Sequence, residues 1–145
     1  MARLATASAL AGSLPALAAG CSIATSGVAF GSYDTLQAMA SDSAGDLTVS
    51  CSVPTAYSVA LGTGAGDYGG RRLTGGRGGG LVYNLFTDAS RSTVWGDGSA
   101  ASVVVSGVAP AGGVAARHTV HGRIPARQNV FVGPYSDSVG ILVSY

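Results

Sequence analysis

The sequence contains no lysine and no glutamate, so its charged side chains are eight arginines and seven aspartates. Lysine and glutamate are favoured on exposed helix surfaces, whereas the glycine, serine, threonine, valine and tyrosine that are plentiful here suit strands and tight turns. The chain is therefore predicted to be all-β. Its formal net charge of +1 provides no basic face, and a nucleic-acid partner is not expected because such partners usually need one.

Long apolar runs are also missing, and none is long enough to cross a membrane as a helix. Residues 1–19 begin with Met-Ala-Arg, continue through a mostly apolar run of small residues and end in Ala-Leu-Ala-Ala. This pattern resembles a short secretory signal with an Ala-x-Ala cleavage site close to Ala18; a retained N-terminal segment is the alternative. The remaining residues 20–145 suffice for one domain and are too few for two ordinary ones.

Cysteine is rare, since Cys21 and Cys51 are the only two. The absence of a Cys-x-x-Cys pair argues against a zinc or redox site. Two cysteines in an exported chain are most simply a disulfide, and closing a loop of about 30 residues would contribute roughly 3 to 4 kcal/mol. Acylation of Cys21 as in a lipoprotein is the alternative, although the residue three before it is Ala18 rather than the expected leucine.

Short apolar or alternating runs separated by Gly, Pro, Ser and Asp indicate a sandwich rather than βαβ units. Strands are predicted at about 21–30, 46–53, 57–62, 80–87, 101–107, 117–124, 128–133 and 138–145. Residues 36–40 could form one helical turn. More than half of residues 62–80 are glycine, so this segment is predicted to be a mobile loop. It contains a GxGxxG pattern, but Gly69-Gly70 prevents the helix that a dinucleotide site needs, and no cofactor is expected.

Side chains for catalysis are few. His118 and His121 lie three residues apart in a predicted strand, so they point to opposite faces and cannot share a metal ion. The serines lack the GxSxG pattern of a nucleophile elbow. The aspartates stand singly beside turn-forming residues, where a short carboxylate accepts backbone N–H groups. We therefore expect neither catalytic residues nor a metal site.

Trp95, within Val94-Trp-Gly-Asp-Gly98, has two interpretations. It is either a ligand-binding aromatic residue or a core anchor that precedes a turn, and the core is favoured. In the first interpretation, Trp95 would join Arg71 and Arg72 of the glycine-rich segment in contacting a sugar or another surface.

The final residues are predicted to form a strand that runs to the end of the chain. Residues 139–145 alternate, with Val139, Ile141, Val143 and Tyr145 on one face and Gly140, Leu142 and Ser144 on the other. This is the period of two that a β-strand produces. A strand at the end of a sheet protein has no further chain beside it, which indicates pairing with another molecule.

A series of short motifs occurs in order between residues 21 and 145. They are Cys21-Ser-Ile, Val28-Ala-Phe-Gly-Ser-Tyr-Asp34, Leu47-Thr-Val-Ser-Cys51, Leu81-Val-Tyr-Asn-Leu-Phe-Thr-Asp88, Val94-Trp-Gly-Asp-Gly98, Val120-His-Gly-Arg-Ile-Pro125 and Gly133-Pro-Tyr-Ser-Asp-Ser-Val139. Together they resemble the spore coat protein U domain, the domain of pilin subunits in archaic chaperone-usher fimbriae.

The resemblance implies an incomplete immunoglobulin-like β-sandwich that lacks its last strand and carries a disulfide corresponding to the two cysteines. It implies that the strand comes from a periplasmic chaperone first and then from the N-terminal extension of the next pilin subunit, with assembly at an outer-membrane usher. Val139, Ile141, Val143 and Tyr145 are then expected to border the acceptor groove, because a donated strand pairs through its main chain and fills pockets with alternate side chains.

The expected function is a non-enzymatic structural subunit of a fimbria or related surface coat, secreted through the periplasm, with a role in adhesion and biofilm formation. A small secreted sugar-binding or surface-binding sandwich, at a fibre tip, is the alternative. The sequence departs from the polymerising members of the family in one respect: those members carry a donor segment before the first cysteine. Cleavage after Ala18 would leave only Ala19 and Gly20 there, whereas a retained leader could present Leu10 and Leu14 on one face of a weak donor strand.

Overall fold

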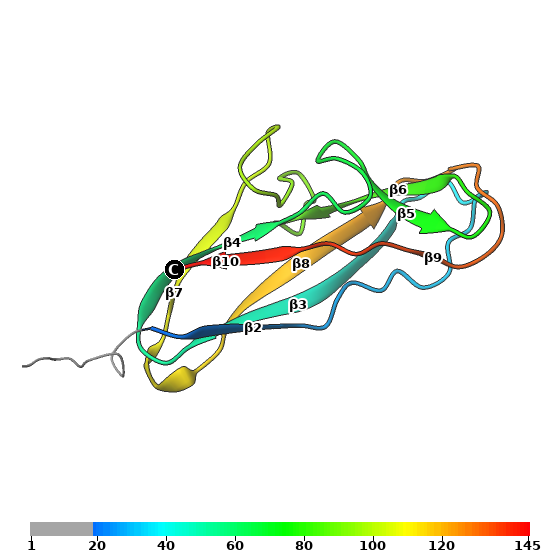
Figure 1. Cartoon of the computed structure of the whole chain (residues 1–145). Coiled ribbons are helices and arrows are strands. Elements are labelled where there is room, and N and C mark those ends of the chain that lie inside the picture. Colours follow the sequence, from blue (N-terminus) through cyan, green and yellow to red (C-terminus); the bar gives the residue numbers. More distant parts are fainter. Residues whose placement is uncertain (1–18) are drawn as a thin grey trace, which may run out of the picture.

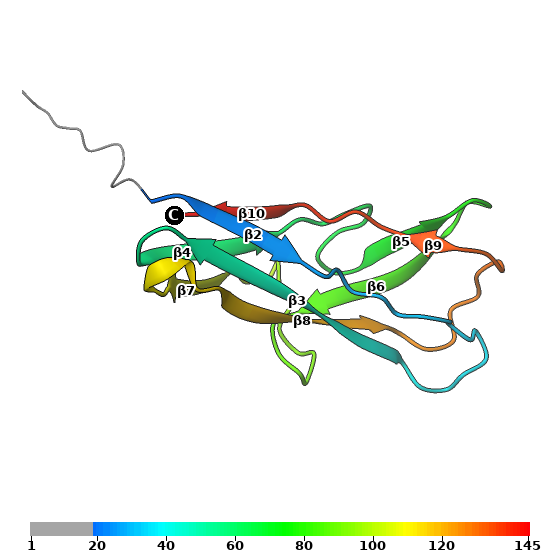
Figure 2. The same ribbon diagram turned by 90° about the horizontal axis from the view of Figure 1, so that it is seen from below.

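The computed structural model describes residues 19–145, which form two antiparallel sheets packed face to face (Figures 1 and 2). The strands are β2 (Cys21–Thr25), β3 (Ser41–Cys51), β4 (Thr55–Leu61), β5 (Arg71–Gly75), β6 (Gly80–Phe86), β7 (Val105–Ala109), β8 (Ala116–Ile124), β9 (Tyr135–Ser136) and β10 (Ile141–Ser144). One sheet has the order β10-β4-β7 and the other the order β2-β3-β8-β6-β5-β9. A 3-10 helix, η2 (Ala111–Gly113), precedes β8. The prediction of an all-β, immunoglobulin-like sandwich is confirmed.

Alternation along the strands builds the core between the two sheets. In β4, the side chains of Tyr57, Val59 and Leu61 are buried, and β3 and β6 show the same period-two pattern. Trp95 lies in this core with 1% of its surface exposed, and its indole N–H donates to the Val59 carbonyl at 2.9 Å. The structure thus agrees with the core interpretation of Trp95.

The glycine-rich segment is more ordered than the predicted mobile loop, because β5 lies within it. The Arg71 side chain is fully buried and donates to the Gly62 carbonyl from Nε at 2.9 Å and from Nη2 at 2.7 Å. It also donates to the Trp95 carbonyl at 2.7 Å and to Asn84 Oδ1 at 2.6 Å. The Arg71 guanidinium therefore provides hydrogen-bond donors for buried backbone carbonyl groups, and it fixes the start of the glycine-rich segment at Gly62.

The strand predicted at 128–133 is absent. Gln128 instead uses its side-chain amide to satisfy β6: Oε1 accepts the Val82 N–H at 2.8 Å, and Nε2 donates to the Val82 carbonyl at 2.8 Å. The side chain therefore occupies the place that a paired backbone would take. The segment that follows crosses to β9, which pairs with β5.

Most other predicted strands are present with shifted ends. The strand predicted at 21–30 ends at Thr25, that at 46–53 begins at Ser41, and that at 101–107 is Val105–Ala109. The helical turn expected at 36–40 is absent, because the Asp34 carboxylate accepts the Leu36 N–H at 2.9 Å and makes a local turn.

The expected secretory signal or donor segment falls on residues 1–18, which lie outside the described residues. Within residues 19–145, no helix has the length and apolar character needed to cross a bilayer.

Candidate functional site: a cleft between two strand edges

Strand β10 forms one edge of the three-stranded sheet, and its backbone has a definite orientation. Gly62 N–H donates to the Gly140 carbonyl at 2.8 Å, in the register that pairs Ile141 with Leu61. Directly opposed residues of an antiparallel pair alternate between hydrogen-bonded and non-hydrogen-bonded positions. The N–H and C=O groups of Ile141 and Val143 therefore point away from β4, toward an edge along which no strand of the described residues lies.

Strand β2 forms an edge of the six-stranded sheet with the same property. Ser26 N–H donates to the Asp46 carbonyl at 3.0 Å, and Ser52 N–H donates to the Gly20 carbonyl at 2.9 Å. By the same alternation, the backbone groups of Ile23 point away from β3. Its side chain lies opposite the fully buried Val49 but is 36% exposed, as expected for a core-facing residue without a covering strand.

One apolar cleft lies where β2 ends, at Thr25, and β10 begins, at Ile141. Figure 2 shows β2 and β10 next to each other along one side of the molecule, running in opposite directions. The cleft between them has a volume of about 180 Å³ and continues into a chamber of about 910 Å³ between residues 28–35 and 130–137. Its lining is Thr25, Gly27, Val28, Phe30, Leu47, Leu61, Leu73, Tyr83, Leu85, Val120, Asp137, Val139 and Ile141. Apolar core side chains therefore remain open to the outside along this groove.

The predicted groove residues lie in two different environments. Val139, Ile141 and Val143 pack against the core, and Val139 and Ile141 line the cleft. Tyr145 follows the end of β10 and is 61% exposed, so the structure does not place it in the cleft with them. The opposite wall includes Val28, which the alternation of residues 139–145 does not reveal.

The wall formed by Val28 and Phe30 has a short alternating pattern in the sequence. Val28 and Phe30 alternate with small residues after the end of β2, and both pack against the core and line the cleft and the chamber. Two apolar residues are too short a pattern to distinguish a groove wall from an ordinary strand.

A polar group interrupts the apolar lining. Tyr83 is buried in the core, and its hydroxyl donates to Asp137 Oδ2 at 2.7 Å. Burial raises the pKa of Tyr83, and the hydrogen bond to Asp137 raises it further, so the phenol remains a proton donor. Burial lowers the pKa of Arg71, while its electrostatic interactions with Tyr83, Tyr68 and Asp137 act in the opposite direction. The groove therefore contains one carboxylate close to a buried cation.

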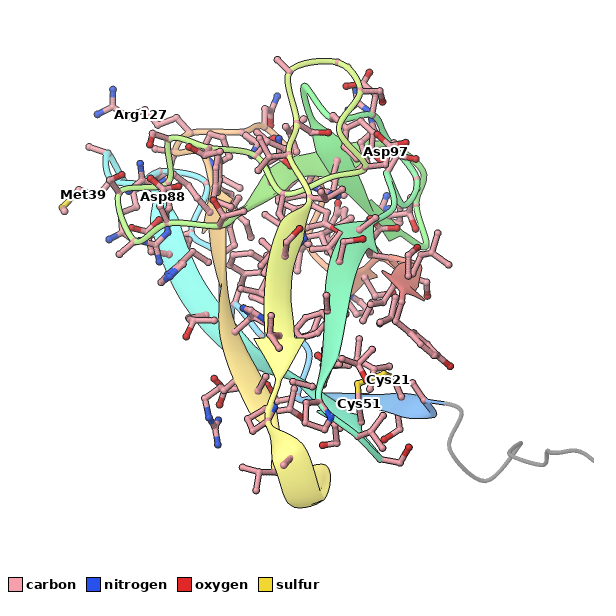
Figure 3. All side chains as sticks on the ribbon, turned by 90° about the vertical axis from the view of Figure 1, so that its left-hand side faces the viewer. Cys21, Met39, Cys51, Asp88, Asp97 and Arg127 are labelled. Atoms are coloured by element: carbon pink, nitrogen blue, oxygen red, sulfur yellow. A yellow bond between two sulfur atoms is a disulfide. The ribbon has the colours of Figure 1, made fainter. Side chains whose placement is uncertain are left out.

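The expected disulfide joins Cys21 to Cys51 (Figure 3). It connects the first residue of β2 to the last residue of β3, which are also direct partners in the sheet. The covalent link thus holds the edge strand β2 to its neighbour β3. A disulfide-bonded Cys21 has no thiol left for the lipid of the alternative hypothesis.

The proposed surface ligand residues do not form a surface site. Arg71 and Trp95 are buried, with 0% and 1% of their surfaces exposed, whereas Arg72 on the same strand as Arg71 is exposed. The interpretation of Arg71 and Trp95 as surface contacts is therefore wrong. The period of two in β5 places the neighbouring arginines on opposite sides of the sheet.

The two histidines lie on opposite faces of β8, as their spacing predicts. His118 faces the core, where its Nε2 and the Tyr57 hydroxyl are 2.6 Å apart and its ring contacts Trp95 edge-on. Burial lowers the pKa of His118. His121, three residues on, pairs with Ala44 and Phe86 across neighbouring strands. In residues 19–145 no three His, Cys, Asp or Glu side chains gather in a way that could hold a metal ion.

Comparisons with known proteins agree with this architecture. The family model described as the Spore Coat Protein U domain matches residues 5–142. A similar solved structure is the CsuC-CsuE chaperone-tip adhesion subunit pre-assembly complex from the archaic chaperone-usher Csu pili of Acinetobacter baumannii, with a TM-score of 0.63 and 23% sequence identity. The match covers 88% of this chain and 40% of that chain. No curated protein matches the sequence.

Proposed function

Because the chain belongs to the Spore Coat Protein U domain family, we propose that it is a structural subunit completed by a strand from another molecule. The cleft between β2 and β10 supports this proposal most directly. Both strand edges present outward-pointing backbone groups, at Ile23 on β2 and at Ile141 and Val143 on β10, and the two β10 side chains also pack against the core. An added strand needs these two features, since main-chain hydrogen bonds provide affinity and pockets for alternate side chains provide specificity.

The geometry also determines how an added strand would pair with each neighbour. Since β2 and β10 run in opposite directions (Figure 2), a strand lying between them is parallel to one and antiparallel to the other. Its hydrogen bonds to the antiparallel neighbour are perpendicular to the strands, and those to the parallel neighbour are slanted. Either direction of entry is compatible with backbone pairing on both sides.

We place this subunit in a chaperone-usher fimbria or a related surface coat. Its partners in this proposal are a periplasmic chaperone, an outer-membrane usher and neighbouring pilin subunits, and its final location is the cell surface. Strands β2 and β10 have no partner on one side among residues 19–145. An apolar cleft beside such edges is an aggregation hazard unless it is covered, which is the physical reason for a chaperone before assembly. Adhesion and biofilm formation would follow from the assembled fibre, without enzyme activity.

Two neighbouring positions on β10 provide a matched test. Ile141 packs against the core, whereas Leu142 points outward and is 64% exposed. Ile141→Asp should abolish filaments on the cell surface in negative-stain electron micrographs, because the charge would lie inside the complemented core. Leu142→Asp should leave filaments intact, and Ile141→Val should as well. Normal filaments in the Ile141→Asp strain would refute the proposal.

A direct binding test separates strand addition from ordinary apolar contact. A short peptide of alternating valine and serine should bind the purified chain, and N-methylation of the amides that face β10 should abolish binding. N-methylation blocks backbone donors while leaving the apolar side chains in place, so an equal affinity of both peptides would show that no strand pairing occurs.

A further inference from the structure

Within residues 19–145, Asp137 is the one charged residue that lines the cleft, and it also lines the adjoining chamber. Three protein donors hold its carboxylate. Oδ1 accepts the Ala65 N–H at 3.0 Å and the Ser138 N–H at 2.9 Å, while Oδ2 accepts the Tyr83 hydroxyl at 2.7 Å. The carboxylate is therefore fixed in position at the junction of the two cavities.

The same carboxylate retains hydrogen-bonding capacity. An ionised carboxylate has about four lone-pair positions on its two oxygens, and the protein donors take two on Oδ1 and one on Oδ2. Gly64 lies against the carboxylate, and a Cβ at that position would collide most closely with Oδ2, so only a glycine leaves that oxygen room for a further partner. The remaining acceptor position belongs to Oδ2, whose residue lines the cleft.

An apolar groove alone leaves the register of an entering strand poorly defined. A shift of one residue exchanges the two faces of a strand, but a shift of two returns the same face to the core. The cleft offers similar aliphatic surfaces at Leu47, Leu85, Val120 and Ile141, so two-residue shifts of an alternating strand change little in apolar contact. A single polar position removes that degeneracy, as a buried polar residue does in coiled coils.

We propose that Asp137 sets the register of the strand that enters the cleft, by accepting a hydrogen bond from one Ser or Thr hydroxyl among its otherwise apolar core-facing side chains. This inference rests on the proposed function and adds to it a specificity-determining residue and the chemistry of its partner. A hydroxyl suits the position because it is small and can donate to Oδ2, whereas an acidic side chain would meet like charge.

The test uses peptides of alternating valine and serine in which one core-facing valine is replaced. Threonine is the matched substitution because it has nearly the shape of valine and adds only the hydroxyl. With the full chain, the threonine peptide should bind about tenfold more tightly than the valine peptide, because one added hydrogen bond to a charged group changes an affinity by about this factor. The aspartate peptide should bind more weakly than both.

Register is measured separately with a photo-crosslinking residue at one end of the peptide. Moving the threonine by two positions should move the crosslinked site on the chain by two residues. Asp137→Asn should reduce the preference for threonine over valine and relieve the penalty of the aspartate peptide. Tyr83→Phe retains the carboxylate and releases a position on Oδ2, so it should preserve the threonine preference even if Asp137→Asn fails to fold.

The outcomes distinguish this inference from the function on which it rests. If no peptide binds the wild-type chain, the proposed strand complementation fails. If peptides bind but threonine and valine are equivalent, or the crosslinks stay in place when threonine moves, Asp137 has only a structural role and the register proposal is wrong.

Discussion

Replacing Cys21 and Cys51 together by alanine should lower the free energy of unfolding by about 3 to 4 kcal/mol. The two residues are 30 apart in the sequence. For a loop near this length, the chain-entropy relation gives a loss of about 12 cal/mol/K, or about 3.6 kcal/mol at 25 °C. Alanine is preferred to serine because Cys51 is buried and a hydroxyl there would need a hydrogen-bond partner.

The assay is guanidinium unfolding followed by far-ultraviolet circular dichroism, on the wild type and the double variant. Wild-type protein unfolded under reducing conditions should match the double variant, because both lose the same constraint on the unfolded chain. Ser22→Ala, on the exposed side of β2, is the matched control and should change little.

The native structure should survive this change. Strand β2 keeps its backbone pairing with β3 from Cys21 to Thr25, so the double variant should still bind an alternating valine-serine peptide. Amide hydrogens of β2 should exchange faster, because one end of the strand is no longer covalently held. A loss of stability below about 1 kcal/mol would refute the entropic reasoning, which requires a substantially larger effect.

Three further predictions concern the rest of the sandwich. Because burial lowers the pKa of His118 in the folded state, the unfolded chain takes up more protons, and the free energy of unfolding should fall as pH drops below about 6.5. Measured by denaturant unfolding between about pH 8 and 5, the free energy of unfolding should depend less on pH in His118→Asn than in the wild type. An equal pH dependence in the two proteins would contradict this. Gln128→Ala should cost about 2 kcal/mol in denaturant unfolding, since it leaves both backbone groups of Val82 without their side-chain partner; an unchanged midpoint would contradict it. Arg123→Gln should cost less than about 1 kcal/mol, and less still in high salt, because its ion pair with Asp42 is partly exposed; a larger, salt-independent loss would contradict it.

The positions of β5 and Gln128 show where local patterns are insufficient. Glycines on both sides of Arg71 indicate a loop, yet the guanidinium pairs with carbonyl groups of Gly62 and Trp95 from distant parts of the chain. Gln128 begins an apparently alternating run, yet its side chain already satisfies Val82, and the backbone continues without strand pairing. Both outcomes depend on partners that are far away in sequence.

Composition and period-two alternation were sufficient for the all-β class and for the core-facing side of Val139, Ile141 and Val143, and the presence of two cysteines left a single possible intramolecular disulfide. These properties depend on residue type and on the local geometry of a strand. Only the tertiary structure brought the end of β2 and the start of β10, which are sheet edges among the described residues, to one cleft and placed Asp137 within it. The physical reason is that pairing between distant segments depends on the closure of the whole chain around one core, whereas side-chain alternation is a property of each strand alone.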